Sequence, residues 1–348
     1  MKKKILSSIV LLCFVFTFSQ SNSYKIHTIA FYNLENLFDV YNDTLKKDEI
    51  SPIMEITSNR ELIYHKKLSN ISKVISEIGK KTSKIAPTII GVSEIENKKV
   101  LEDLIQTPLL KKENYGIIHH DSPDLRGIDV GFLFKKNHFT PLHFQAYELK
   151  LWSDKGNRIY TRDQLLVSGY LENEMVHFII NHWPSRRGGE KRSRRLREKA
   201  ALLTKKICDS LFSSNEKAKI IVMGDFNDDP IDSSFKNFLH TNHDSKTTDS
   251  TDLFNPYENL FLKGFNTLGY RDNLNLFDQI LISKNLISKS KKFETLAFFK
   301  AKIFNPKYLT QQKGRYKNYP FRSFQNGKFT NGYSDHYPVN IFLIKQFN

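Results

Sequence analysis

The segment "IIVMGDFNDDP", residues 220–230, joins an apolar run to a turn that is crowded with polar side chains. Four apolar residues lead into a glycine, and Asp225, Asn227, Asp228 and Asp229 follow within five positions. A short apolar run that ends in Gly and Asp predicts a strand covered on both faces. So much negative charge at one strand end predicts either a solvated turn or a positively charged group at that place.

Apolar runs of strand length recur along the chain, and they determine the expected fold. Helical periodicity occurs in only three places, residues 61–79, 97–106 and 190–212. Many strands, few helices and no strict β–α–β alternation predict an α+β fold in which two sheets pack face to face with helices outside. No linker or repeat interrupts the pattern, so we expect residues 24–348 to form a single domain. The runs are "KIHTIAFYN", "PTIIGVSE", "GIDVGFLF", "QLLVSGYL", "MVHFIINHW", "AKIIVMGDF", "LFDQILIS" and "HYPVNIFLI".

The first twenty residues, "MKKKILSSIVLLCFVFTFSQ", have the layout of a secretory signal peptide. Their apolar run is short for a membrane span, although a retained anchor is the alternative reading. We therefore expect residues 1–20 to be removed and the mature protein to be secreted, periplasmic or on the cell surface, with no stable membrane insertion. Cys208 is then the only cysteine left, and it falls on the apolar face of a helical pattern, as a small core residue does.

The formal net charge of +16 favours a polyanionic partner. Removal of the three lysines of the signal peptide leaves +13 (16 − 3). Nucleic acid, acidic glycans and a membrane surface all fit this charge, and charge alone does not choose among them. The segment "SRRGGEKRSRRLREK", residues 185–199, concentrates the positive charge directly after His182. It predicts either a surface that binds the backbone of a polyanion or a solvated helix face.

Polar residues capable of chemistry gather at the ends of the apolar runs. In a two-sheet sandwich these ends can converge on one rim, where loops shape a site. Glu94, Asp335 and Asn33 offer hard oxygen ligands, which suit Mg²⁺, with Mn²⁺ or Ca²⁺ as further possibilities. The residues at these ends are Asn33, Glu35, Glu94, Glu96, Asn181, His182, Asp225, Asn227, Asp278, Asp335 and His336.

The same set also contains the groups for general acid–base catalysis. Asp278 can fix the tautomer of His336 and stabilise its protonated form. Asn227 and His182 can donate hydrogen bonds to a phosphate. Hydrolysis of a phosphodiester requires such a combination of a cation, a base and donors.

Seven motifs in order, "NLENLFD", "GVSEIEN", "RGIDVGFLF", "NHWPSRRGG", "GDFND", "DQILIS" and "SDHYPV", cover nearly all of the chain after residue 24. Together they resemble the metal-dependent endonuclease/exonuclease/phosphatase superfamily, which includes deoxyribonuclease I and abasic-site endonucleases. Within it, the chain is similar to bacterial secreted endonucleases. The resemblance implies a four-layer αββα sandwich of two packed, mostly antiparallel sheets flanked by helices, with its site at one edge of the sheets.

The resemblance also assigns roles to individual residues. Either His336 or Asp225 is the general base. The acids of residues 220–230 are expected to be tolerated because a divalent ion and a bound phosphate lie among basic residues nearby. The assignments are Glu94 as principal metal ligand with Asn33 and Glu35 in the metal shell, His182 on the scissile phosphate, Asp225 and Asn227 on water and a phosphoryl oxygen, Asp278 with His336 as the dyad, Asp335 as the last member of the acid cluster, and Arg162 on phosphate.

These observations predict a secreted, metal-dependent nuclease that hydrolyses phosphodiester bonds of DNA, with RNA as a further substrate. Arg186, Arg187 and Arg126 are the expected substrate contacts beside Arg162, although Arg126 could instead anchor the loop before a core strand. The alternatives are a phosphatase or a lipid phosphodiesterase on the same scaffold, and a non-enzymatic basic extracellular DNA-binding protein. No protein partner is evident, and we expect a monomer.

Overall fold

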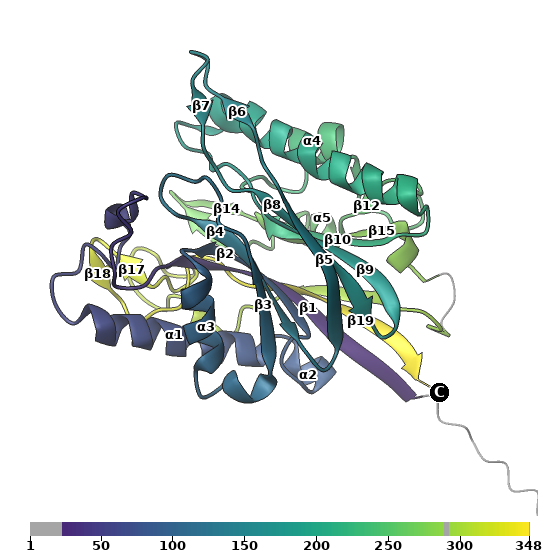
Figure 1. The fold of residues 1–348 in the computed structure, drawn as a ribbon, viewed down its shortest axis with the longest axis horizontal. Coiled ribbons are helices and arrows are strands. Elements are labelled where there is room, and N and C mark those ends of the chain that lie inside the picture. The colour runs from purple at the N-terminus through teal and green to yellow at the C-terminus, as the bar shows by residue number, and fades with distance from the viewer. Residues whose placement is uncertain (1–22, 289–291, 348) are drawn as a thin grey trace, which may run out of the picture.

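The computed structural model describes residues 23–288 and 292–347, and the expected signal peptide lies outside these residues. Within them, two large β-sheets pack face to face, with helix α4 on one outer side and helices α1 and α3 on the other (Figure 1). The predicted α+β fold with two packed sheets and four layers is confirmed.

The first sheet has six strands in the order β16-β19-β1-β2-β4-β3. β1 pairs in parallel with β2, and its other neighbour β19 is antiparallel, as are the remaining pairs. The strands are β1 (Ser23–Leu37), β2 (Ile89–Ile95), β3 (Tyr115–His119), β4 (Asp129–Lys135), β16 (Ala297–Ile303) and β19 (Val339–Phe347).

The second sheet has seven strands in the order β11-β12-β15-β10-β9-β8-β5. β10 is parallel to β9 and antiparallel to β15, so the central strands are mixed in direction. The strands are β5 (Phe139–Tyr147), β8 (Gln164–Leu171), β9 (Glu174–His182), β10 (Lys219–Asp225), β11 (Thr241–Asn242), β12 (Leu253–Phe254) and β15 (Asp278–Ser283).

The hydrophobic pattern of the sequence explains the layers. Phe31, Phe132, Phe178 and Met223 belong to the core between the sheets, which is why the central strands are apolar on both faces. A second core joins the first sheet to α1 and α3, and a third, which includes Cys208, joins the second sheet to α4. The three predicted helices are confirmed at α1 (Arg60–Glu77), α3 (Lys98–Gln106) and α4 (Glu190–Ser214).

Shorter elements complete the described chain. None of its helices is both long enough and apolar enough to cross a membrane. One short hairpin, made of β6 and β7, projects beyond the second sheet near the start of α4 (Figure 1). The elements are α2 (Lys80–Ser83), α5 (Pro256–Phe261), β6 (Leu151–Trp152), β7 (Arg158–Ile159), β13 (Leu268–Tyr270), β14 (Asn273–Asn275), β17 (Phe324–Gln325), β18 (Lys328–Phe329), a π-helical turn at Ser234–Leu239 and 3₁₀ turns at Asp48–Ile50, Lys111–Glu113, Lys284–Leu286 and Lys307–Leu309.

Candidate active site

Glu94 owes its position to a bulge near the end of β2. Ser93 pairs with Asn33 and Val130, but the next paired residue is Ile95, so both neighbouring strands skip Glu94. Its backbone is left-handed, with φ 58°, which a non-glycine residue adopts rarely. Bulges re-aim a side chain, and unusual backbone angles of this kind concentrate at functional sites. The local structure thus turns this carboxylate out of the alternation of the strand.

Three site residues lie in one row across the second sheet. Asp225, at the end of β10, pairs with Asp278 at the start of β15 on one side and with His182 at the end of β9 on the other. All three side chains are buried. The expectation that the ends of the apolar runs converge therefore has a simple basis. The pairing of three strands brings together residues that are up to 96 positions apart (278 − 182).

The side chain of Asn33 bridges the two sheets at this edge. Its amide nitrogen donates to Glu94 Oε1 at 3.2 Å and to Asp225 Oδ2 at 3.0 Å. The other Glu94 oxygen accepts from the backbone N–H of Asn36 at 2.9 Å. His182 faces the same two carboxylates, with Nε2 3.6 Å from Asp225 Oδ2 and 4.0 Å from Glu94 Oε1. The carboxylates from the two sheets thus share one set of polar contacts.

His336 and Asp278 form a buried pair beside Asp225. His336 Nδ1 donates to Asp278 Oδ2 at 2.7 Å, and its Nε2 lies 3.9 Å from Asp225 Oδ2. Ser334 fixes the loop that carries His336, because its hydroxyl donates to the Asn33 carbonyl at 2.7 Å and accepts from the His336 N–H at 3.1 Å. Asp278 therefore orients the imidazole, as the sequence predicted for a His–Asp couple, and Ser334 holds the backbone of His336.

The electrostatics of the site separate the two histidines. Burial disfavours a charged His336, but Asp278 and Asp225 outweigh it and raise the pKa of this imidazole well above its usual value. Burial, together with the cations Arg162 and Arg126, lowers the pKa of His182 well below its usual value. Burial, aided by the charges of Asp278 and Glu94, raises the pKa of Asp225 to about 7, although His336 opposes the shift. One histidine is held protonated and the other neutral.

The donor set fits a hard divalent cation. Glu94, His182 and Asp225 each offer one ligand atom within 4.8 Å of the others, and so do Asp225, Asp278 and His336. One oxygen of the fully buried Asp278, Oδ1, has no hydrogen-bond partner. Carboxylate and amide oxygens with an imidazole, and no thiolate, suit Mg²⁺, Mn²⁺ or Ca²⁺ better than softer metals. Glu94 would hold the ion, which when bound neutralises phosphoryl oxygens.

Arg162 lies under the site and acts on its loops. Its guanidinium donates to the Trp183 carbonyl at 2.7 Å and to Asp124 Oδ2 at 3.3 Å. The Asn227 amide donates to the same Trp183 carbonyl at 3.1 Å. Arg126 is half-exposed, and its Nε is 3.9 Å from Asp124 Oδ1, so it lies at the rim. The indole of Trp183 is fully buried against Phe226 and Phe235 and is unavailable for stacking on a base.

Glu35 and Asp335 are engaged elsewhere than in the Glu94–Asp225 contacts. The Glu35 carboxylate accepts from the N–H groups of Ser323 and Phe324 and pairs with Arg322 at 3.3 Å. Arg322 also pairs with Asp335 at 2.9 Å. Neither acid belongs to the clusters within 4.8 Å that include Glu94 or Asp225. In this structure both acids anchor the loop that leads to His336, rather than joining the expected metal shell.

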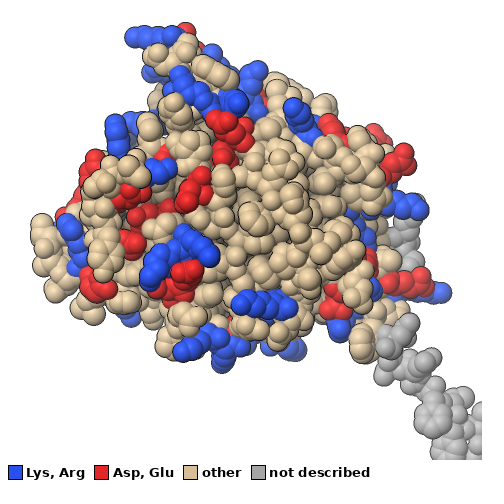
Figure 2. Space-filling view, in the orientation of Figure 1, with Lys and Arg blue, Asp and Glu red and all other residues tan. Residues whose placement is uncertain are grey.

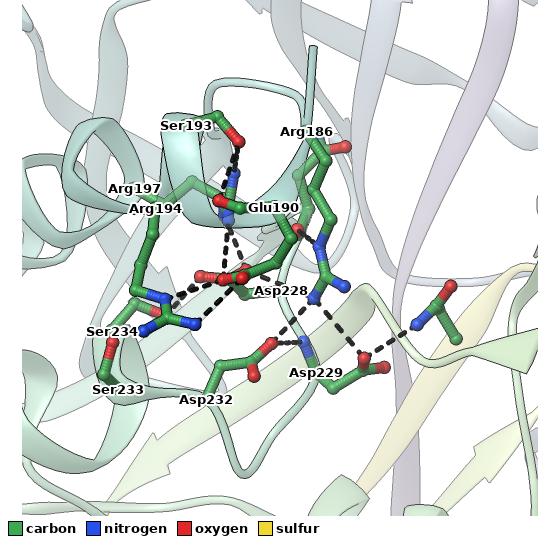
Figure 3. Close-up of polar contacts among 12 residues, drawn as sticks. Arg186, Glu190, Ser193, Arg194, Arg197, Asp228, Asp229, Asp232, Ser233 and Ser234 are labelled. Carbon is green, nitrogen blue, oxygen red and sulfur yellow. Dashed lines mark hydrogen bonds and ion pairs between the residues drawn. The ribbon is translucent and has the colours of Figure 1, made fainter. Parts of the chain in front are cut away.

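Two arginines of the basic segment 185–199, Arg186 and Arg197, are folded onto the acids of the opening motif (Figure 3). Arg186 donates to the Asn227 carbonyl at 2.9 Å and pairs with Asp232 at 2.7 Å, Asp228 at 3.2 Å and Asp229 at 3.4 Å. Arg197, fully buried on α4, donates to Asp228 Oδ1 at 2.5 Å. These two arginines are the expected basic residues and balance Asp228 and Asp229, so among these acids only Asp225 is left for the expected divalent ion. The expected substrate contact Arg186 is a structural clamp here.

Only part of the segment is left for a ligand. Arg194 pairs with Glu190 at 2.7 Å, and Arg195 pairs with Asp154 at 2.6 Å. Among the described residues no ion pair is found for the exposed side chains of Arg187, Lys191, Arg192 and Lys199. Arg194 and Arg195 therefore fit the alternative of a solvated helix face. The four cations without an ion pair in the described chain, which include Arg187, are left for a ligand.

The sequence did not single out several residues that hold the site together. Ser334 positions the loop of His336, Asp124 positions Arg162, and Arg322 positions Asp335. Lys67, buried on α1, donates to the carbonyls of Glu35 and Asn36. Ser334 stood inside a recognised motif, "SDHYPV", which was a usable signal. Arg322 and Lys67 stand in no motif, and only the folded contacts reveal them.

Comparison with known proteins places this geometry in a family. The model of the endonuclease/exonuclease/phosphatase family matches residues 28–345. A search of curated proteins finds no significant match.

Solved structures share the fold at low identity. An endonuclease/exonuclease/phosphatase family protein from Bacteroides thetaiotaomicron has 16% identity and a TM-score of 0.54, over 93% of this chain and 97% of that one. D. rerio TDP2, complexed with single strand DNA product, has 12% identity and a TM-score of 0.52, over 91% of this chain and 98% of that one. The mannosyl-6-phosphatase Bt3783 of Bacteroides thetaiotaomicron has 16% identity and a TM-score of 0.52, over 91% and 99%.

The family match spans nearly the whole chain and includes every strand that positions the site. The chain therefore belongs to the endonuclease/exonuclease/phosphatase family, whose members are hydrolases acting on phosphoester bonds.

Proposed function

We propose that the protein is an exported, divalent-metal-dependent phosphodiesterase that hydrolyses the backbone of DNA. The observation that carries the proposal is the position of Asp225. This carboxylate contacts Asn33, which also contacts Glu94, and it lies 3.9 Å from His336 of the buried couple. Groups that would hold a cation and groups that transfer protons therefore meet at one carboxylate, as hydrolysis of a phosphoester requires.

In the proposed reaction, Asp225 accepts the proton of the attacking water. Burial raises the pKa of this carboxylate, which favours its taking up a proton. The protonated His336, held by Asp278, donates a hydrogen bond to the phosphoryl group. The neutral His182 and the amide of Asn227 hold its oxygens from the other side. The bound ion would add positive charge to that of the protonated His336.

The rim supports a nucleic acid as the substrate. On the β6–β7 hairpin the guanidinium of Arg158 lies 5.2 Å from the ring of Trp152 and 5.6 Å from that of Tyr160, and both rings are about half exposed. Exposed aromatic rings and cations together bind single-stranded nucleic acid by stacking and charge. In Figure 2 lysine and arginine side chains cluster on this projecting hairpin. The structural neighbour that was solved with a DNA product agrees with this choice.

A side-by-side assay tests the proposal against its alternatives. The mature protein is incubated with plasmid DNA, a phosphomonoester and sphingomyelin, each with Mg²⁺, Mn²⁺ or Ca²⁺. We expect DNA cleavage that EDTA abolishes and that D225N lowers by about 10²–10⁴-fold. DNA that stays intact with all three ions refutes the nuclease, and cleavage of the phosphomonoester or the lipid alone assigns the corresponding alternative. DNA binding that survives EDTA without turnover would make it a binding protein.

Export is part of the proposal and rests on residues 1–20. Expression of the full chain in a bacterial host, followed by N-terminal sequencing of the protein outside the cytoplasm, tests it. A mature protein that begins close to residue 21 is expected. A protein that keeps residues 1–20 would make them an anchor.

A further inference from the structure

A second acid-lined cavity lies beside the candidate active site and shares no side chain with the contacts described there. Its volume is about 50 Å³, several times the room that one water needs. Its walls come from the loop after β1, from the residues that follow β2, and from the β3–β4 loop together with the first residue of β4. The polar lining includes Asp43, Asp48, Glu96, Asn97, Asp121 and Asp129.

The cavity holds far more negative than positive charge. Five of these six side chains are carboxylates, and Asp48, Asp129 and Glu96 are buried. Lys46 also lines the cavity, but its ammonium donates to the carbonyls of Ser122 at 2.8 Å and Asp124 at 3.3 Å. The excess occurs in a chain whose net charge is +16, so a general acidic composition does not explain it. In Figure 2 acidic side chains gather on the left of the view, on the side where the loop after β1 projects in Figure 1.

One buried oxygen in the lining has no partner. Asp48 is 1% exposed, and its Oδ2 accepts from the Asp43 N–H at 2.7 Å, but its Oδ1 has no hydrogen bond. A buried carboxylate oxygen without a donor is costly, and proteins normally pair it or use it to coordinate a metal. This oxygen therefore points to a cation independently of the number of acids around it.

The buried carboxylates Glu96 and Asp129 are fixed by hydrogen bonds, and Glu96 keeps one oxygen for a ligand. Glu96 Oε2 accepts from the Asp39 N–H at 2.7 Å, which leaves Oε1 free. Asp129 accepts from the Ser122 N–H at 2.8 Å and lies 3.1 Å from His119 Nε2, so its position is fixed. On this wall Asp121, Asp129 and His119 have ligand atoms within 4.8 Å of one another. The lining is thus preformed rather than flexible.

We propose that this cavity binds a divalent cation of the calcium class, with part of its water shell, separately from the catalytic ion. Ca²⁺ accepts six to eight oxygen ligands in irregular geometry, and waters complete a set of spread carboxylates. Asp48, Glu96 and Asp43 from one side and Asp129 with Asp121 from the other would hold it.

Such an ion would join loops that flank the active site. The loop after β1 already contacts the β3–β4 loop, since the Lys47 N–H donates to the Leu125 carbonyl at 2.8 Å. The β3–β4 loop carries Asp124, which pairs with the buried Arg162, and the rim residue Arg126. Neutralising the carboxylates between these loops would hold Arg162 and Arg126 in place. The ion is therefore structural, and turnover is not needed to detect it.

The experiment uses a background in which the catalytic ligands are disabled, E94Q with D225N. After chelator treatment and dialysis, Ca²⁺ binding is measured by calorimetry and by its effect on thermal unfolding. We expect one equivalent of Ca²⁺ to bind and to raise the melting temperature, because a ligand of the native state stabilises it. Adding D48N should weaken the affinity by at least about tenfold, whereas the control D252N, in a loop of the second sheet, should change nothing.

The same variants give a second readout. Without Ca²⁺, D48N should unfold at a higher temperature than its background, because the amide removes an unpaired buried charge. With Ca²⁺ the order should reverse. If D48N fails to fold, E96Q takes its place in the same two measurements. No Ca²⁺ binding in the background, or binding that neither D48N nor E96Q weakens, overturns the proposal and leaves a water-filled acidic cavity. DNA cleavage plays no part in either result, so the outcome is independent of the proposed nuclease activity.

Discussion

Two neighbouring arginines with different surroundings allow a matched test of the structure. Arg186 pairs with three aspartates and holds the Asn227 carbonyl, and its guanidinium lies 4.5 Å from the centre of the Phe277 ring. Arg187, the next residue, is exposed and has no ion pair in the described chain. We expect R186A to damage stability and turnover, and R187A to affect only the binding of a polyanion.

The magnitude for R186A follows from its contacts. Removing one partner of a buried ion pair costs about 3–5 kcal/mol. The Arg186 side chain is 26% exposed, and Arg197 still neutralises Asp228, so we expect a smaller loss of about 2–3 kcal/mol in the free energy of unfolding. At roughly 2 °C per kcal/mol for a domain of this size, the melting temperature should fall by about 4–6 °C. R187A, a surface substitution, should stay within about 0.5 kcal/mol of the parent.

Thermal unfolding and cleavage of plasmid DNA over a range of salt concentrations are the assays. The Asn227 N–H donates to Asp225, so a displaced loop should lower kcat of R186A by about 10–100-fold. R187A should keep its kcat and reduce the salt slope of DNA binding by about one phosphate contact, near 0.9. If R186A melts like the parent and loses only DNA affinity, as R187A does, the clamp is refuted. Arg186 would then be the substrate contact that the sequence suggested.

Two further predictions concern other buried groups. D278N should lower kcat by about 10²–10⁴-fold, because the couple with His336 is lost, and turnover equal to the parent would exclude the couple from catalysis. Burial lowers the pKa of His27 to about 4, against the opposing charge of Glu172, while the unfolded imidazole titrates near 6.5. The contribution of His27 to the free energy of unfolding should therefore be fully present above pH 6.5 and should decrease by about 2 kcal/mol from pH 7 to pH 5, as the unfolded state takes up the proton. Urea unfolding of H27Q should lack this component, and a variant that keeps the full decrease would contradict the assignment.

The fold was predictable because its cues are local. Apolar runs and 3.6-residue periodicity depend on neighbouring residues, and they located the helices that became α1, α3 and α4. The clustering of His182, Asp225 and Asp278 was predictable for a related reason, since parallel strands such as β9 and β10 end at the same edge of a sheet and an antiparallel neighbour such as β15 begins there. Cys208 was also interpreted correctly as a core residue.

The details that were not predictable depend on contacts between distant loops. The sequence around Glu35 does not indicate that its carboxylate accepts hydrogen bonds from N–H groups almost 290 positions later. From its sequence, the segment that contains Arg186 is interpreted as positive charge exposed to solvent or to a ligand. The ion pairs of Arg186 with Asp228 and Asp229 appear only in the folded structure. The bulge at Glu94 depends on the register of two neighbouring strands, which a single strand sequence does not contain. Charge and motif predicted which residues matter more readily than what each of them contacts.

The place of β19 in the first sheet has a consequence for the timing of activity. β19 lies between β1 and β16, and the loop that leads into it carries His336. A chain emerging from the ribosome has made Glu94, His182 and Asp225 long before this strand exists. Until β19 inserts beside β1, the proton-transferring couple has only one member. For the nuclease proposed above, the nascent polypeptide would therefore be inactive towards the nucleic acids of the cell that makes it until β19 has taken its place in the sheet.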